Sequence, residues 1–419
     1  MGIFLKNKNF RKLTLASWLS TAGDILFYLA LMTYASKLHN YTLAISLISI
    51  TEAIPRLIQS LSGYYADRTK NKLKMIVWLA IIRFVLYLIV GLLFVTNIAG
   101  WNLVLIVIGI NFISDISGMY SSGLTTPLIV DLVGANEISE AEGFTSGISE
   151  IISTIAQFVG SGLLLFFSYS NLAIINALTF LAAGLLYVSI NHSYLQDHAK
   201  EEIKVNEQGF FTTLKSSFMQ IKKANGLLTV ISVIALLNGI LMALEPLISI
   251  VVAGNKTMLI GTYSFTIALI GAINSIGLAL GSAIGTMIFK KASLFTITLL
   301  DTVVSAGTAL AVIAQNIIAT LIFIALLSFF AGVASPKMSQ WLVSAVDRTI
   351  LSSSIGALNT ILQVAGPLMT TIFTSIASAI NINVALASLI VVSVAVFIVA
   401  FYVMKKTQKT TPEVEPNIG

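Results

Sequence analysis

Residues 73–96 have the sequence LKMIVWLAIIRFVLYLIVGLLFVT, an apolar run interrupted by one lysine and one arginine. An α-helix needs about 20 residues of this kind to cross the hydrocarbon core of a bilayer, which is about 30 Å thick. Similar runs occur along the whole chain. The predicted spans are 12–36, 42–66, 73–96, 101–130, 142–168, 170–190, 225–253, 262–288, 293–314, 316–340, 352–379 and 383–404.

The composition of the chain indicates a lipid environment. Hydrophobic residues make up 57% of the 419 residues and charged residues only 10%, whereas about a quarter of the residues of a soluble domain are charged. The other structure that crosses membranes, the β-barrel, shows segments of about ten alternating residues, and this sequence does not alternate in that way. We therefore predict an all-α integral membrane protein with 12 transmembrane helices.

Basic residues are concentrated on one side of the predicted spans. With the N-terminus in the cytoplasm, only Lys37 and Lys256 of the 24 basic residues lie in outer loops, and Arg56 and Arg83 lie within spans. Cytoplasmic loops of membrane proteins are enriched in lysine and arginine. Both termini are therefore predicted to be cytoplasmic.

The longest polar stretch lies in the middle of the chain and leaves six spans on each side. Its second part is amphipathic at helical spacing, as expected of a helix on the inner membrane surface, although a simple tether is an equal alternative. The predicted domains are an N-terminal six-helix bundle at 1–190, a cytoplasmic linker with an amphipathic helix at 191–224, a C-terminal six-helix bundle at 225–404 and a cytoplasmic tail at 405–419.

Proline and glycine recur at the same spacing in both halves. Pro127 and Gly147 are 20 residues apart, as are Pro336 and Gly356, and the two pairs are offset by 209 residues. Paired six-helix repeats that enclose a site near the middle of the bilayer are a known transporter architecture. The repeat therefore favours a transporter.

The loop between the second and third spans resembles the signature cytoplasmic loop of the major facilitator superfamily. It has the sequence GYYADRTKNK at 63–72, with a glycine, an Asp-Arg pair and basic residues, but Lys70-Asn71 stand near the usual Gly-Arg. STAGD at 20–24 and PLIVDLV at 127–133, followed by Gly143, are similar to the macrolide-efflux-like drug:proton antiporters. The segment 157–162 lacks the proline of the antiporter motif. The resemblance implies two six-helix bundles and proton-driven alternating access.

The loop motif is predicted to form part of a cytoplasmic gate. Gly63 would permit close helix approach, and Asp67 and Arg68 lie where helix ends and neighbouring charges can pair. Asp131, at the cytoplasmic end of the fourth span, is a candidate partner of Arg68. The alternative is that the basic residues only determine topology. The predicted gate motif consists of Gly63, Asp67, Arg68, Lys72 and Asp131.

Ionisable residues inside the spans are the candidates for transport chemistry, because each costs about 2.5–3.5 kcal/mol to insert. Polar residues three or four positions apart form stripes on spans one, two, four and five, and such stripes should line a cavity. Acids outnumber bases, so pairing cannot neutralise all of them: Asp24, Glu52, Asp115, Glu150, Glu245 and Asp301 stand against Arg56 and Arg83. The predicted proton-coupling residues are Asp24, Asp115 and Glu150.

A substrate cavity is predicted around these acids. Glu52 and Arg56 are one turn apart and could form an ion pair with only a structural role, and Arg83 could brace Asp24 or Asp115. Asp301, nearer the inner surface, is predicted to be structural. The predicted cavity residues are Tyr28, Glu52, Arg56, Arg83, Asn111, Gln157, Asn238, Met242, Glu245, Asn359 and Gln363.

The function that these patterns favour is proton-coupled efflux of hydrophobic or amphipathic small molecules, such as drugs or macrolides. Transport of a polar metabolite, siderophore or short peptide is the alternative, because Arg56 and Arg83 could hold an anion; a non-transporting membrane component is a third. The chain has no cysteine and no nucleotide-binding loop, so we expect no enzyme activity, metal or cofactor. The expected partners are a small molecule, protons and the lipid bilayer, not nucleic acid, for a monomer in a bacterial plasma membrane.

Overall fold

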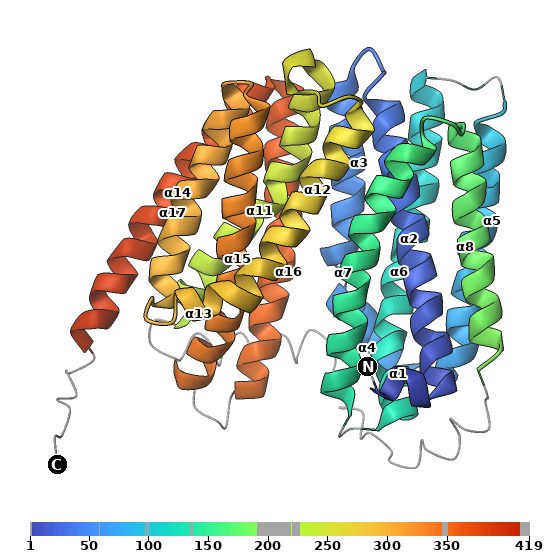
Figure 1. The fold of residues 1–419 in the computed structure, drawn as a ribbon, viewed down its shortest axis with the longest axis horizontal. Helices are drawn as coiled ribbons and strands as arrows, with labels where there is room; N and C mark the ends of the chain where they lie inside the picture. The colour runs from blue at the N-terminus through green and yellow to red at the C-terminus, as the bar shows by residue number, and fades with distance from the viewer. Residues whose placement is uncertain are drawn as a thin grey trace. The chain divides into compact units, whose positions relative to one another are not determined.

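The structure is a computed structural model of the chain, and it describes residues 2–57, 59–96, 98, 100–134, 137–190, 219, 227–345 and 351–410. These residues form helices joined by short turns (Figure 1). The predicted linker at 191–224 lies outside the described residues except for residue 219, and the end of the predicted tail also lies outside them.

The chain divides into two compact units, and each is described by itself. Unit 1 comprises Met1–Phe210 and Val252–Ala272, and unit 2 comprises Phe211–Val251 and Ile273–Gly419. The helices of the first unit up to residue 190 are α1 (Gly2–Lys6), α2 (Lys8–Ala35), α3 (Tyr41–Leu57), α4 (Gln59–Arg68), α5 (Lys72–Leu93), α6 (Gly100–Val133), α7 (Ile138–Leu163) and α8 (Tyr169–Val188).

Two helices near the middle of the chain, α11 (Leu227–Gly254) and α12 (Tyr263–Leu280), contribute residues to both units. The short 3-10 helix η1 (Lys256–Met258) lies between them, and α12 continues into a π-helical turn, η2 (Gly281–Gly285). The helices that follow are α13 (Thr286–Ile288), α14 (Leu294–Ile313), α15 (Ile317–Ala345), α16 (Leu351–Ala379) and α17 (Ile382–Thr410).

Nine helices of the described residues are long and apolar enough to cross a membrane. They coincide with nine of the predicted spans and begin with α2, α5, α6 and α8 in unit 1. The other three predicted spans fall on α3 with α4, on α7 and on α16. Of these, α3 has only 17 residues and α4 only 10. The prediction of an all-α, multi-pass membrane protein is confirmed, while the count of twelve spans stays a prediction.

Several membrane helices, among them α5, α8, α14 and α17, begin after a polar residue whose side chain caps the first turn. Such a residue accepts a hydrogen bond from a backbone N–H that has no partner within the helix. The cap bonds come from Lys74 N to Asn71 at 3.1 Å, Asn171 N to Ser168 at 3.2 Å, Thr296 N to Ser293 at 3.1 Å and Val384 N to Asn381 at 2.8 Å. These caps begin α5, α8, α14 and α17.

The burial pattern of α5 shows how a uniformly apolar helix is oriented. Its exposed residues recur every three or four positions, as do its buried ones, so one face packs against protein and the opposite face remains exposed. The exposed set includes Trp78, Ile82, Val85, Ile89 and Leu92, and the buried set includes Ile76, Ala80, Arg83, Tyr87 and Val90. Arg83 and Tyr87, the polar residues in the middle of the helix, therefore both point into unit 1.

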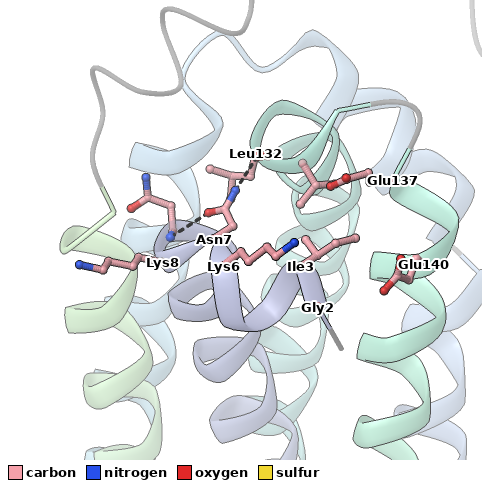
Figure 2. Close-up of a pocket in the computed structure, with 10 residues that line it drawn as sticks. Gly2, Ile3, Lys6, Asn7, Lys8, Leu132, Glu137 and Glu140 are labelled. Atoms are coloured by element: carbon pink, nitrogen blue, oxygen red, sulfur yellow. Dashed lines mark hydrogen bonds between the residues drawn. The ribbon is translucent and has the colours of Figure 1, made fainter.

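A short N-terminal segment ties together one end of unit 1. The Asn7 side chain caps α2 by accepting hydrogen bonds from two backbone N–H groups, and its Nδ2 donates to the carbonyl oxygen of Leu132 in α6 at 2.7 Å. Phe4 stacks on Trp18 of α2 and contacts Phe144 of α7. Figure 2 shows the pocket beside this segment, into which Lys6 and Glu140 also project. The segment thus connects α2, α6 and α7.

Replacing Asn7 by alanine should lower the unfolding free energy by about 1 kcal/mol, the usual cost of losing a helix N-cap. The bond to Leu132 would be lost as well, which adds to this cost. The apparent unfolding temperature of the purified protein in detergent measures the effect. Lys8→Ala, at an exposed position next in sequence, is the control. Equal unfolding temperatures for the two variants would contradict the assigned role of Asn7.

Candidate functional site

An ion pair inside unit 1 joins α2 to α5. Nη2 of Arg83 donates to both carboxylate oxygens of Asp24, at 2.6 and 2.7 Å, and Nε donates to Oγ of Ser114 in α6 at 3.0 Å. The sequence left Asp24 and Asp115 open as partners of Arg83, and the structure shows Asp24. Charge-assisted bonds of this length are among the strongest in proteins, so this contact fixes the relative positions of three helices.

Residues of α8 and α6 enclose the Arg83 guanidinium on the sides that do not face Asp24. Its guanidinium carbon lies 3.9 Å from the ring centroid of Phe180 in α8, in the geometry of a cation–π interaction. Gly118 of α6 provides the remaining space, because a Cβ atom there would lie only 3.3–3.4 Å from the guanidinium. The side chain of Arg83 is 7% exposed, whereas that of Asp24 is 37% exposed. The carboxylate is therefore the reachable half of the pair.

A second polar network continues from α5 to α6 and α3. The hydroxyl of Tyr87 donates to Oδ1 of Asn111 at 2.5 Å, and Nδ2 of Asn111 donates to Oδ2 of Asp115 at 2.7 Å and to Oε2 of Glu52 at 3.5 Å. The carboxyl groups of Glu52 and Asp115 are also within hydrogen-bonding reach of each other. Ionised carboxylates only accept hydrogen bonds, so a bond between these two groups requires a proton.

The charges of the two networks nearly cancel. Arg56, one turn along α3 from Glu52, is the cation that acts on that carboxylate. The cluster therefore contains three carboxyl groups and two guanidinium groups: Asp24, Glu52 and Asp115 with Arg56 and Arg83. With every carboxyl ionised it has an excess of one negative charge, and one bound proton makes it neutral. We call these five residues with Tyr87 and Asn111 the polar cluster.

The other predicted residues of unit 1 differ in burial. Glu150 is exposed on α7, while Tyr28 of α2 and Gln157 of α7 are half-buried. The structure thus brings together two of the three predicted proton-coupling residues, Asp24 and Asp115, with four of the predicted cavity residues. The role of Glu150 stays a prediction.

In unit 2, two of the three predicted cavity residues of α11 lie against α16. Nδ2 of Asn238 donates to the carbonyl oxygen of Leu362 at 3.3 Å, and the sulfur of Met242 fills the space beside Gly366. Glu245 is exposed. The side chains of two further predicted residues, Asn359 and Gln363, lie outside the described residues.

Asp301 of α14 is 1% exposed, and its oxygens have no hydrogen-bond partner among the described residues. The sequence suggested a structural role for this aspartate, and that role stays a prediction.

The predicted gate motif lies at the end of unit 1 where α4 ends. A Cβ atom on Gly63 would meet no atom of the described residues within 4 Å, and the close helix approach expected at this glycine stays a prediction. A close approach occurs at Gly123 of α6, where a Cβ would lie 3.3 Å from the backbone of Ser62. Ser62, one position before Gly63, is thus a residue of α4 that faces α6.

Some contacts of the charged gate residues Arg68 and Asp131 are described. Nη1 of Arg68 donates to the carbonyl oxygen of Tyr64 at 3.1 Å, and its guanidinium carbon lies 3.4 Å from the Tyr64 ring centroid. The positive charge of Lys72 attracts the Asp131 carboxylate. The side chain of Asp67 lies outside the described residues. The gate role of these residues stays a prediction.

Sequence reasoning missed three residues that shape the polar cluster. Ser114 and Phe180 contact Arg83 directly, and Tyr87 donates to the amide oxygen of Asn111. For Tyr87 a signal existed, because it lies one helical turn after Arg83 and must share its face. For Phe180 the sequence offered no such signal, because nothing distinguishes this phenylalanine from the other aromatic residues of the apolar spans.

These observations define a multi-pass helical membrane protein in which charged side chains meet between the helices of one unit. The family profile described as Major Facilitator Superfamily matches residues 13–370, and the chain belongs to this superfamily. It is accordingly a transporter and not an enzyme. No curated protein sequence matches the chain.

Solved structures share the fold over nearly the whole chain. An aspartate-to-alanine variant of the nucleoside transporter NupG has a TM-score of 0.72 at 12% identity and covers 95% of this chain and 99% of its own. A POT family transporter in complex with 5-aminolevulinic acid has a TM-score of 0.71 at 11% identity, covering 97% of each chain. A bacterial homolog of the human lysosomal transporter Spinster has a TM-score of 0.68 at 14% identity, covering 96% and 98%.

The space beside Arg83 can be tested with a matched pair of alanine substitutions in α6. Gly118→Ala should displace the guanidinium by a few tenths of an ångström and weaken the bonds to Asp24, whereas Gly109→Ala adds a Cβ where no atom lies within 4 Å. Alanine favours a helix over glycine by about 1 kcal/mol. Gly109→Ala should therefore be neutral or stabilising in thermal unfolding, and Gly118→Ala should be destabilising. A stabilising Gly118→Ala would show that Arg83 is not confined there.

Removal of both partners of the ion pair should cost less than the sum of the two single removals. Arg83→Gln and Asp24→Asn each leave one charge without its partner, at about 3 kcal/mol, the low end of the range for buried pairs because Asp24 is partly exposed. The double variant should be less unstable than the sum of the single variants. A double-mutant cycle of thermal unfolding measures this coupling, and additive effects would mean that the pair contributes nothing.

Proposed function

We propose that this chain is a proton-coupled secondary active transporter that exports hydrophobic or amphipathic small molecules, cationic ones above all, by alternating access. The observation that carries the proposal is the polar cluster of unit 1, in which three carboxyl groups face two guanidinium groups. Such a cluster gains electrical neutrality by binding one positive charge. That charge is either a proton or the charge of a substrate.

Competition between these two charges would give exchange transport. In a site of low dielectric, binding a second positive charge would recreate a net charge, which is costly. A cationic substrate would then expel the proton, and a proton would expel the substrate. Each ligand lowers the affinity for the other by the same factor. This coupling is what an antiporter requires.

Within the cluster, Asp24 is the group best placed to exchange a proton. It is the more exposed partner of its ion pair. A proton on Asp24 would remove the charge that holds Arg83, and Asp115 is the other carboxylate whose charge acts on this arginine. A partner exchange by Arg83 would shift the helices that carry these residues. We propose this exchange as the step that links protonation to the alternation between two states.

The alternative substrate class, a polar metabolite, siderophore or short peptide, would use an arginine to hold an anionic group. The geometry weighs against Arg83 in this role, because its side chain is 7% exposed and already bound to Asp24 and Ser114. Arg56 remains the candidate for such a contact. The test must therefore include both substrate classes.

Reconstituted proteoliposomes with a pH-sensitive dye inside provide the test. Tetraphenylphosphonium and erythromycin represent the proposed class, and uridine and dialanine the alternative. We expect the first two to drive proton movement, and Asp24→Asn to reduce it at least about tenfold, with a smaller loss in Asp115→Asn. Glu140→Gln, at an exposed carboxylate of α7, is the control.

Two outcomes would contradict the proposal. Normal proton movement in Asp24→Asn would remove Asp24 from the coupling mechanism. Proton movement driven only by uridine or dialanine would assign the chain to the alternative class. Tetraphenylphosphonium binding, measured separately by equilibrium dialysis, distinguishes lost coupling from lost substrate binding.

A further inference from the structure

We infer that Tyr87 is a positioning residue of the polar cluster, which fixes the orientation of the Asn111 amide and thereby presents an N–H donor to the carboxyl groups of Glu52 and Asp115. The inference deepens the proposed function, because these carboxyl groups are part of its proton site. The geometry that supports it is independent of what is transported.

The position of the Tyr87 hydroxyl is fixed by packing. The residue is 1% exposed, and its ring meets Phe27 edge-on at a centroid distance of 4.9 Å and Phe180 at 5.5 Å. Phe27 and Phe180 are themselves fully buried. Since an aromatic side chain has only two rotatable bonds, these contacts leave the hydroxyl little freedom. It meets the Asn111 side chain, which is 7% exposed.

An asparagine amide has two different ends, an acceptor oxygen and a donor NH₂ group. Tyr87 donates to the oxygen, so the NH₂ group of Asn111 faces Asp115 at 2.7 Å and Glu52 at 3.5 Å. In this orientation the amide stabilises carboxylates, which are pure acceptors. The opposite orientation would place the amide oxygen against the carboxyl groups and would favour their protonated form.

Tyr87 therefore favours the ionised form of the Glu52 and Asp115 carboxyl groups. Other charged groups also act on these carboxyls from neighbouring helices: Asp24 of α2, Arg56 of α3 and Arg83 of α5. Among the described residues, the hydrogen bond to the Asn111 oxygen comes from Tyr87 and not from any of these three. Loss of the hydroxyl alone would leave their charges in place and change only the amide. This separation makes the inference testable.

The decisive variant is Tyr87→Phe, which keeps the packed ring and removes one hydroxyl. The readout is the carbonyl-stretch band of protonated carboxyl groups in infrared spectra of the purified protein across a pH series. The band that disappears in Asp115→Asn identifies the signal of the carboxyl pair. We expect its midpoint in Tyr87→Phe to move to higher pH by about one unit, because one hydrogen bond to a charged group is weakened.

Tyr34→Phe is the matched control. Its hydroxyl accepts a hydrogen bond from Gly100 N at 3.0 Å, and its ring packs against Phe94 and Tyr169, outside the polar cluster. The midpoint should not move in this variant. An unchanged midpoint in Tyr87→Phe, or an equal shift in Tyr34→Phe, would overturn the inference.

A double variant tests whether Tyr87 acts through Asn111. In the Asn111→Leu background there is no amide to orient, so adding Tyr87→Phe should cause no further shift. Independent, additive shifts would overturn the inference.

The proteoliposome assay separates the positioning role of Tyr87 from the proposed function. If the midpoint shifts as expected but tetraphenylphosphonium moves no protons, the positioning role stands and the transport proposal fails.

Discussion

The Arg83–Asp24 ion pair is the interaction on which the arrangement of unit 1 depends. A guanidinium that is 7% exposed is tolerable only if its charge is balanced and its N–H groups are bonded. α2 supplies the balancing charge, α6 supplies the Ser114 acceptor and the gap at Gly118, and α8 supplies the Phe180 ring. One arginine thus sets how four helices meet, and the second network grows from the same face of α5 through Tyr87.

The sequence predicted the helices well because a bilayer demands long apolar runs, and each predicted span has a helical counterpart among the described residues. It predicted contacts less well, because in an apolar helix such as α5 both faces have similar hydropathy. Only Arg83 and Tyr87 distinguish the buried face. The sequence left both Asp24 and Asp115 open as partners of Arg83, because the choice depends on how the helices are rotated about their axes. Near the gate motif, the residue of α4 that meets Gly123 of α6 is Ser62, the neighbour of Gly63. Successive residues of an α-helix are rotated by about 100° around its axis. Span boundaries predicted from sequence are not accurate to one residue, so they do not determine which residue faces a given neighbouring helix.

The two units use equivalent positions for different chemistry. Counted from the caps of α5 and α14, Arg83 corresponds to Ser305, and counted from the caps of α8 and α17, Phe180 corresponds to Ser393. Arg83 and Phe180 form the cation–π contact, whereas Ser305 and Ser393 form a neutral hydroxyl pair at 3.2 Å. The same helix contact is therefore charged in unit 1 and uncharged in unit 2. This agrees with a concentration of titratable chemistry in the first half of the chain.

The unequal exposure of the ion pair has a consequence for ionic strength. Mobile ions screen charges that they can surround, and they act weakly on charges enclosed by protein. Arg83 is enclosed by Phe180, Ser114 and Gly118, so added salt approaches the pair only from the side of Asp24. Lys72 and Asp131, at helix ends, are half-buried and lie closer to the ionic solution. Salt concentration should thus weaken electrostatic contacts at the end of unit 1 well before it affects those in its interior.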